Sequence, residues 1–209
     1  MKTQAPLSPA AERNKGPISE VLADVLPRDG RVLEIASGTG QHVLHFAATL
    51  SGGLQWQPTE ADAARHAELA ARLAASPQDN VLAPLPLDVE RLPWPVHGAF
   101  DAVVCINMIH IAPYTATAAL LRGAHAVLQG GGHGQLILYG PFTERGAHTA
   151  SSNAAFDVSL RARHPDWGVR DLDEVTALAE RAGFQRRRVV RMPANNLTVV
   201  FARGAHAPG

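Results

Sequence analysis

The fold is decided by the stretch RVLEIASGTGQHVLHFAATL at residues 31–50. Residues 31–35 are a short apolar run typical of a strand, residues 37–40 form a tight glycine turn, and residues 42–50 have the aliphatic spacing of a helix. Gly38 and Gly40 have no side chains, so the backbone can turn sharply and a ligand can approach it closely. A helix that starts near Gln41 aims its first amide groups at that ligand. The stretch therefore predicts a strand, a ligand-binding turn and a helix.

Strands and helices alternate in the same way along the rest of the chain. Further strands are predicted at residues 54–59, 81–89, 100–106 and 135–139, and helices at residues 17–25, 61–75, 115–128 and 171–182. The first of these helices is expected to begin at Pro17, which suits a first helical turn. Two closing strands, residues 184–191 and 197–202, are joined through residues 192–196. The pattern predicts an α/β fold, a doubly wound, mostly parallel sheet with a C-terminal antiparallel hairpin.

The composition indicates one globular domain without a strongly charged surface. The chain has 209 residues, 46% of them hydrophobic, and its 19 basic and 19 acidic residues cancel. This balance disfavours nucleic-acid and membrane partners. Cys105 is the single cysteine, which excludes an intramolecular disulfide and favours a reducing compartment. Residues 1–9 lack an apolar core, and no apolar run reaches the roughly 18 residues of a spanning helix, so we expect a cytoplasmic protein.

Acidic residues fall at three successive predicted strand ends. Glu34 precedes the glycine turn, Glu60 follows the second strand, and Asp88 lies at the end of the third. Each of them is either part of a ligand site or a helix cap or solvated loop carboxylate, and for Glu60 capping of the following helix is a serious alternative. A dinucleotide fingerprint G-x-G-x-x-G requires glycine at positions 36, 38 and 41, where this chain has Ala36, Gly38 and Gln41. The spacing therefore disfavours a dinucleotide.

Residues 34–40 resemble the first motif of the class I S-adenosylmethionine-dependent methyltransferases, in which an acidic residue precedes spaced small residues. The resemblance implies a Rossmann-like, seven-stranded sheet with a terminal reversed hairpin, and S-adenosylmethionine as the cofactor. In that family the acidic residue after the second strand holds both ribose hydroxyls, and the one after the third accepts from the adenine amino group. Glu60 and Asp88 occupy the matching positions, and a carboxylate suits a diol because it accepts two hydrogen bonds. The turn is expected to contribute Glu34, Ala36, Ser37, Gly38 and Gly40.

Five further stretches resemble a narrower group, the methyltransferase-like proteins to which methyltransferase-like 26 belongs. They cover much of the chain and lie at residues 8–15, 106–111, 138–142, 167–171 and 192–196. The resemblance implies the same fold and cofactor but supplies no acceptor. Residues 1–16 are expected to form an N-terminal segment that folds over the cofactor site, and residues 17–209 to form the methyltransferase domain.

The acceptor side is expected just after the fourth strand, where methyltransferases border the methionine end of the cofactor. His110 is either a base or orienting group, with an ordinary pKa of about 6.5, or a histidine packed against the sheet edge. Asn107 either accepts from the cofactor's ammonium group or caps the turn before Pro113. Arg13 either clamps the cofactor's carboxylate with its forked donors or is a tail charge.

Other polar and aromatic residues form the pool from which an acceptor pocket is drawn. Tyr139, as a catalytic and substrate-binding residue, and Asn196, as a substrate-binding residue, join His110 as the candidates. Trp167 is more typical of packing, and Asp157 and Arg161 have the i,i+4 spacing of an exposed ion pair. The rest of the pool consists of Phe142, Asn153, Arg170 and Asn195.

The sequence thus predicts an enzyme that transfers a methyl group from S-adenosylmethionine to a small-molecule acceptor. The alternatives are a protein that binds S-adenosylmethionine without turnover and an NAD-dependent oxidoreductase. Because sulfonium is an excellent leaving group, positioning alone suffices for a thiol, an amine or an ionised oxygen acceptor. No metal is expected, since the H-E-x-x-H pattern is absent. The run at residues 186–188, three arginines, indicates a charged guard on a sheet edge.

Overall fold

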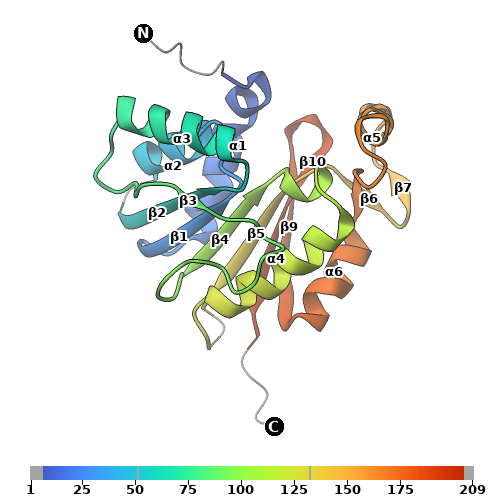
Figure 1. Ribbon diagram of the computed structural model, residues 1–209. Helices are drawn as coiled ribbons and strands as arrows, with labels where there is room; N and C mark the ends of the chain where they lie inside the picture. The colour runs from blue at the N-terminus through green and yellow to red at the C-terminus, as the bar shows by residue number, and fades with distance from the viewer. Residues whose placement is uncertain (1–6, 51, 132, 205–209) are drawn as a thin grey trace.

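A central sheet of seven strands organises the computed structural model, which describes residues 7–50, 52–131 and 133–204 (Figure 1). The strand order is β3-β2-β1-β4-β5-β10-β9. The pairs from β3 to β5 are parallel, whereas β10 is antiparallel to both β5 and β9. The predicted α/β sheet with an antiparallel C-terminal hairpin is confirmed. The strands are β1 (Asp29–Ile35), β2 (Gly53–Glu60), β3 (Leu85–Pro86), β4 (Ala102–Ile106), β5 (Gln135–Gly140), β9 (Phe184–Met192) and β10 (Asn196–Arg203).

Helices cover both faces of this sheet (Figure 1). The first face packs against α1 (Pro9–Val25), α2 (Gln41–Thr49) and α3 (Ala63–Ala75), and the second against α4 (Tyr114–Val127) and α6 (Leu172–Arg181). Successive side chains of a strand point to opposite faces, so β4 directs Val104 to the first core and Val103 and Cys105 to the second. All three are buried, as expected for a strand covered on both sides.

The predicted start of the first helix at Pro17 was wrong. The helix begins eight residues earlier, at Pro9. Ser8 is the N-cap, its Oγ accepting from the amide of Ala11 at 3.4 Å, and Pro9 occupies the first turn. Pro17 therefore lies inside α1, where the helix continues because Ile18 and Leu22 are completely buried against the sheet. Residues 1–6 of the expected N-terminal segment lie outside the described part of the chain, and the proposed division at residue 16 stays a prediction.

The third strand is much shorter than the predicted run of residues 81–89. Only Leu85–Pro86 pairs with β2 as a strand, and Val81 forms an isolated bridge with Trp56. Pro84 and Pro86 have no amide hydrogen to donate, which confines such a segment to a sheet edge and shortens its ladder. The edge position of β3 in the strand order agrees with this reason.

Residues 142–171 fold into elements that the sequence pattern did not indicate. A small sheet with the order β7-β6-β8 lies at the end of the central sheet (Figure 1). Its strands are β6 (Phe142–Glu144), β7 (Ala147–His148) and β8 (Arg170–Asp171), and α5 (Ser151–Arg163) connects the last two. This insertion packs beside the carboxyl end of β5, which places it next to the ligand-binding edge expected for such sheets.

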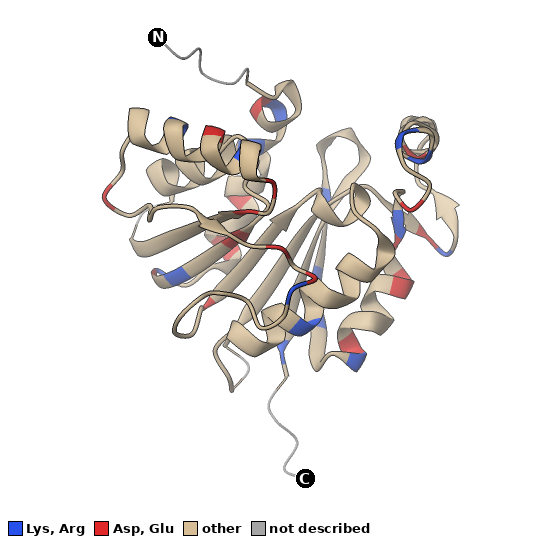
Figure 2. Cartoon of the chain, viewed as in Figure 1, with Lys and Arg blue, Asp and Glu red and all other residues tan. Residues whose placement is uncertain are grey.

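Basic and acidic side chains are interspersed along the chain (Figure 2). Arg186, Arg187 and Arg188 lie in β9, which is an edge strand, so the prediction of a charged sheet edge is confirmed. Arg188 pairs with Asp24 of α1 at 3.5 Å. Within the described ranges, no helix combines the length and the apolar character needed to cross a membrane.

Candidate functional site

The glycine turn after β1 has the predicted tight geometry. Ala36, Gly38 and Gly40 adopt positive φ angles of 54°, 57° and 77°. Ser37 fixes the turn to β2, because its amide donates to the Thr59 carbonyl at 2.7 Å and its Oγ accepts from the Thr59 amide at 3.1 Å. A Cβ on Gly40 would lie 2.7 Å from a methyl carbon of Leu69, whereas a Cβ on Gly38 would come no closer than 4.0 Å to its nearest neighbour, the Ala36 carbonyl oxygen. Gly40 therefore serves packing, and Gly38 presents bare backbone.

A cavity of about 570 Å³ opens in front of this turn, at the carboxyl ends of β1, β2 and β4. Its walls come from α1, the glycine turn, the end of β2, α3, the segment after β3 and the segment after β4. Six of the predicted cofactor residues line it, namely Ala36, Ser37, Gly38, Glu60, Asp88 and Asn107. The predicted residues Arg13, Glu34, Gly40, His110, Tyr139 and Asn196 are not among the lining residues.

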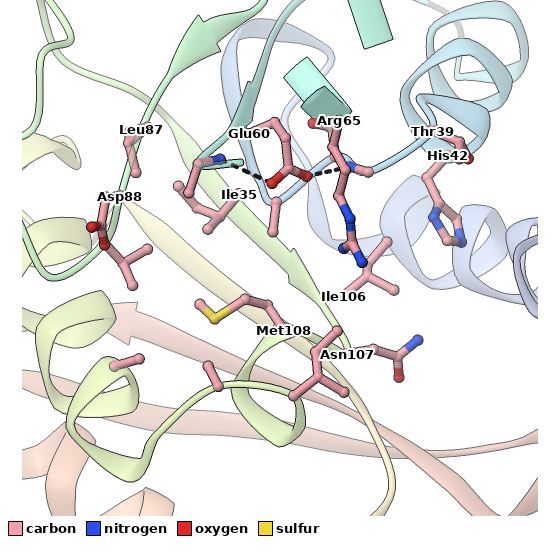
Figure 3. A pocket seen from close by; sticks show the side chains of 18 of the residues that line it. Ile35, Thr39, His42, Glu60, Arg65, Leu87, Asp88, Ile106, Asn107 and Met108 are labelled. Carbon is pink, nitrogen blue, oxygen red and sulfur yellow. Dashed lines mark hydrogen bonds between the residues drawn. The ribbon is translucent and has the colours of Figure 1, made fainter. Parts of the chain in front are cut away.

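Glu60 projects into the middle of the cavity from the end of β2 (Figure 3). Its Oε2 accepts from the Gly38 amide at 3.1 Å, and its Oε1 accepts from the amides of Ala61 and Asp62 at 2.9 and 3.1 Å. The alternative that Glu60 caps α3 is wrong, because Asp62 is the N-cap and accepts from the Arg65 amide at 2.9 Å. These bonds hold the carboxylate against the glycine turn, and Oε2 keeps acceptor capacity for a ligand.

Asp88 lies at one end of the cavity, beside apolar side chains (Figure 3). Its Oδ1 accepts from the Glu90 amide at 3.0 Å, and its Oδ2 pairs with Arg91 at 3.3 Å. Leu87 and Met108 are buried and line the cavity next to it. This end combines an exposed carboxylate acceptor with apolar surface, which is what an aromatic base with an exocyclic amino group requires.

Asn107 reaches the cavity because its backbone is left-handed. Its φ angle is 61°, its amide donates to the Tyr139 carbonyl at 2.8 Å, and its carbonyl accepts from the His110 amide at 3.2 Å. It is also the N-cap of the short 3-10 helix Met108–His110, although its side chain makes no capping bond. The side chain of Asn107 is thus left to face the cavity.

His110 is a packed histidine and does not line the cavity. It is completely buried, its ring lies edge-on to Phe142 at 5.2 Å between centroids, and its Nδ1 accepts from the Arg170 amide at 3.4 Å. Burial and the nearby Arg170 lower its pKa to about 3. Its Nε2 has no partner among the described residues and lies against Gly140, where a Cβ would approach it within 2.4 Å. The structure therefore brings no proton-accepting histidine from this segment to the cavity.

Tyr139 and Asn196 lie side by side on the first face of the sheet. The Tyr139 hydroxyl forms hydrogen bonds with the side chains of Asn14 and Asn196, and burial raises its pKa. Asn196 also donates to the Pro193 carbonyl at 3.2 Å. The neighbouring Asn195 carbonyl accepts from Asn153 of α5 at 2.9 Å, which connects the small-sheet insertion to the turn between β9 and β10. None of these residues is among those that line the cavity.

Glu34 is buried directly beneath the glycine turn. Its Oε2 has no hydrogen-bond partner among the described residues, and burial raises the pKa of the carboxyl group to about 7. The backbone carbonyl of the same residue accepts from the hydroxyls of Thr59 and Ser37 at 2.8 and 3.4 Å. Glu34 thus supports the turn from below and retains an unsatisfied oxygen.

Helix α1 closes the cavity through one side chain that the sequence analysis used only to exclude a dinucleotide. The Oε1 of Gln41 accepts from the Ser8 amide at 2.6 Å and from the Thr39 hydroxyl at 2.9 Å. Its Nε2 donates to the Glu12 carboxylate at 2.7 Å. Ser8 and Ala11 line the cavity as a result. Gln41, one of the two positions that fail the dinucleotide fingerprint, thus attaches the N-terminal helix.

We expect Gln41→Ala to release the first turns of α1. The buried side chain holds Ser8 and Glu12, so its loss should lower the free energy of unfolding by about 1–2 kcal/mol. Amide hydrogen exchange at residues 8–16 should accelerate. Gln78→Ala is the matched control, since Gln78 donates to the Leu44 carbonyl at 2.9 Å and, in the described part of the chain, forms no hydrogen bond with α1. Equal exchange at residues 8–16 in both variants would contradict this role.

The sequence analysis did not single out Arg65 or His42 for this site, although both line the cavity. Arg65 of α3 directs its guanidinium group into the cavity, and His42 lies at the end opposite Asp88 (Figure 3). Arg13, the predicted cation, is exposed on α1. His42 could have been predicted from its place two residues after Gly40. Nothing in the sequence marked Arg65, because exposed arginines are common in helices.

A family model described as "Protein of unknown function (DUF938)" matches residues 5–203 of the chain. Among solved structures, the mitomycin 7-O-methyltransferase MmcR has a TM-score of 0.76 at 17% identity, over 92% of this chain and 54% of that one. The calicheamicin-biosynthesis methyltransferase CalO1, solved with S-adenosylhomocysteine, has a TM-score of 0.69 at 19% identity, over 92% and 53%. An O-methyltransferase family protein from Burkholderia thailandensis has a TM-score of 0.73 at 13% identity, over 95% and 59%.

These similarities concern the fold, and the chain spans little more than half the length of the three solved proteins. The seven-stranded sheet of this chain is therefore the sheet of a Rossmann-like methyltransferase fold.

Proposed function

The chain belongs to the family described as "Protein of unknown function (DUF938)", and because that description states no activity, we propose an activity from the site itself. We propose that the protein transfers the methyl group of S-adenosylmethionine to a small-molecule acceptor. The resemblance of several stretches to methyltransferase-like 26 is in line with this proposal. The three similar solved structures, two methyltransferases and one O-methyltransferase family protein, support the choice of reaction class at the level of the fold.

The observation that carries the proposal is the convergence of Gly38, Glu60 and Asp88 on one cavity. These residues come from three separate segments, and each suits a different part of an adenosyl group. The Glu60 carboxylate suits the ribose diol, and Asp88 with its apolar neighbours suits the adenine ring. The bare backbone at Gly38 allows close approach, since nothing occupies the space where its Cβ would stand.

S-adenosylmethionine fits the residues that are present. The volume of about 570 Å³ lies in the range of small-molecule and cofactor sites, which is roughly 300–1,000 Å³. The unpartnered Glu34 Oε2 lies beneath the turn and outside the cavity lining, so a bridging water would connect it to the ligand. When bound, S-adenosylmethionine supplies an electrophilic methyl group on a sulfonium leaving group.

The chain's own residues then bind, orient and exclude water. Glu60 and Asp88 hold the adenosyl group, Ile106 and Asn107 form the floor toward the methyl group, and α1 covers the opposite end with Ser8 and Ala11. Among the described residues that line the cavity, His42 is the one histidine. Burial lowers its pKa to about 4, so it is a weak base. We therefore propose an acceptor that is already nucleophilic near neutral pH, such as a thiolate, an ionised oxygen or a neutral amine.

Glu60→Gln is the direct test of the adenosyl site. The amide group offers one acceptor oxygen instead of two and turns an NH2 group toward backbone amides, so the ribose should lose its partner. We expect S-adenosylhomocysteine to bind about 10- to 100-fold more weakly in calorimetry, or roughly 1.5–3 kcal/mol. Glu68→Gln, at an exposed lining residue, is the control and should change affinity less than about twofold. Unchanged affinity in Glu60→Gln would refute the assignment.

Two binding and turnover measurements separate the proposal from its alternatives. Thermal stabilisation by NAD without stabilisation by S-adenosylhomocysteine would favour an oxidoreductase. Binding of S-adenosylmethionine with no release of S-adenosylhomocysteine across a broad panel of thiols, phenols and amines would favour a binding protein without turnover. Release of S-adenosylhomocysteine with one of these acceptor classes supports methyl transfer and identifies the class.

A further inference from the structure

His42 occupies the end of the cavity that the adenosyl group leaves free. In Figure 3, Asp88 and Leu87 lie at one end, Glu60 lies in the middle, and Thr39 and His42 lie at the other end. His42 belongs to the first turn of α2 and lines the cavity together with Ser8 and Ala11 of α1. If adenine lies beside Asp88 and the ribose beside Glu60, the amino-acid end of S-adenosylmethionine reaches His42. This placement rests on the proposed function.

The neighbours of the His42 ring determine which nitrogen carries the proton. Its Nε2 lies 2.8 Å from the Oδ1 of Asn14. An amide oxygen only accepts, so Nε2 must be the donor, and Nδ1 of the neutral ring is then an acceptor. The Asn14 side chain also bonds the Tyr139 hydroxyl, so it has hydrogen-bond partners on two sides. Among the described residues, no protein group bonds Nδ1.

The surroundings also keep the ring uncharged. Burial lowers the pKa of His42 to about 4, and the charges of His45 and Lys15 act in the same direction, opposed by Glu12. The ring stacks on Phe46, with 5.6 Å between centroids, which further excludes water from one side. Near neutral pH, His42 therefore presents a lone pair and no positive charge to the cavity.

We propose that Nδ1 of His42 accepts a hydrogen bond from the α-ammonium group of S-adenosylmethionine. A lone pair attracts a cationic donor and repels a carboxylate, so the residue distinguishes the two ends of the zwitterion. Arg65, the cation that lines the same cavity, suits the carboxylate. Asn14 of α1 acts as a positioning residue, because it holds the tautomer in which Nδ1 accepts. The hydrogen bond between Asn14 and His42 thus contributes both to the docking of α1 and to the recognition of the ammonium group.

The test compares two ligands that differ only at the proposed contact. S-adenosylhomocysteine and its analogue with hydrogen in place of the α-amino group are titrated into the wild-type chain, His42→Ala and His45→Ala by calorimetry. We expect His42→Ala to weaken S-adenosylhomocysteine by about tenfold or more and the deamino analogue by less than about twofold. His45 does not line the cavity, so His45→Ala should leave both affinities unchanged. His42→Gln, which keeps a hydrogen-bond acceptor, should recover part of the loss.

The possible failures are distinguishable. Equal losses for the two ligands in His42→Ala, or no loss for either, would overturn the role of His42 and leave the methyltransferase proposal standing. Failure of the wild-type chain to bind either S-adenosylhomocysteine or 5'-methylthioadenosine would overturn the proposed function and this inference with it. Imidazole nitrogen shifts at pH 7 supply a second readout that does not depend on affinity. A protonated Nδ1 in the wild-type chain contradicts the proposed tautomer. In Asn14→Leu the ring should no longer be restricted to the tautomer with the proton on Nε2.

Discussion

Arg170→Met should lower the free energy of unfolding by about 3–5 kcal/mol. Arg170 is buried and donates to three backbone carbonyls, those of Ile109 at 2.8 Å, Ala112 at 2.6 Å and Asp166 at 3.0 Å. A methionine fills much of the same volume but leaves these carbonyls without a donor. Urea unfolding at neutral pH measures the loss.

The same substitution should also weaken ligand binding, because Ala112 lines the cavity. The matched control is Arg161→Met, since Arg161 is exposed and its pair with Asp157 at 3.1 Å should contribute less than about 1 kcal/mol. A similar small loss in the free energy of unfolding of both variants would contradict the role of Arg170 in holding the segment after β4. The sequence analysis placed Arg170 among candidates for an acceptor pocket, and the structure instead places it under the wall of the cavity, holding the segment after β4.

Glu34→Gln should make the chain more stable than the wild type at pH 8, with a smaller difference at pH 5. Burial raises the pKa of Glu34 from the ordinary 4.5 to about 7. Between these values the folded state keeps a proton that the unfolded state has released, so the wild-type free energy of unfolding falls as pH rises from about 4.5 to 7. Above pH 7 the penalty is constant. Glutamine resembles the protonated acid and removes this slope.

The expected change in the stability difference between pH 5 and pH 8 is on the order of 3 kcal/mol, at about 1.4 kcal/mol per pKa unit. Urea unfolding of both proteins at the two pH values measures it. Burial shifts the pKa of His42 and His110 in the opposite direction, which makes both proteins lose stability in acid, but these contributions cancel in the difference. A difference that does not change with pH would show that Glu34 is not held protonated in the folded state.

The parts of the site that follow from sheet geometry were predictable from the sequence. Parallel strands end at one edge, so acidic residues after the second and third strands were expected to lie near the glycine turn. Glu60 and Asp88 do line one cavity with Gly38. The helix start at Ser8 was missed because two prolines, Pro9 and Pro17, both carry the signal for a first turn.

The parts that depend on contacts between distant segments were not predictable. Gln41 bonds Ser8 across 33 positions of the chain, and Arg170 bonds Ile109 across 61. No local pattern encodes such pairs, because any polar side chain near a turn has the same appearance in one sequence. The burial of His110 depends likewise on Phe142, in an insertion whose short strands carry too few residues for a periodic signal.

The proline inside α1 divides the helix into two parts that are held in different ways. Pro17 has no amide hydrogen, so the carbonyl of Arg13 loses its helical partner and the helix is weakest between its second and third turns. Beyond that point Ile18 and Leu22 are anchored in the core, whereas ahead of it the helix is held mainly by side-chain hydrogen bonds from Gln41 and His42. The first two turns therefore bury less apolar surface than the rest of the helix, with Ala11 as their buried apolar residue. If S-adenosylmethionine binds as proposed, we expect its exchange to follow the local opening of residues 8–16 and to be independent of the global stability of the sheet.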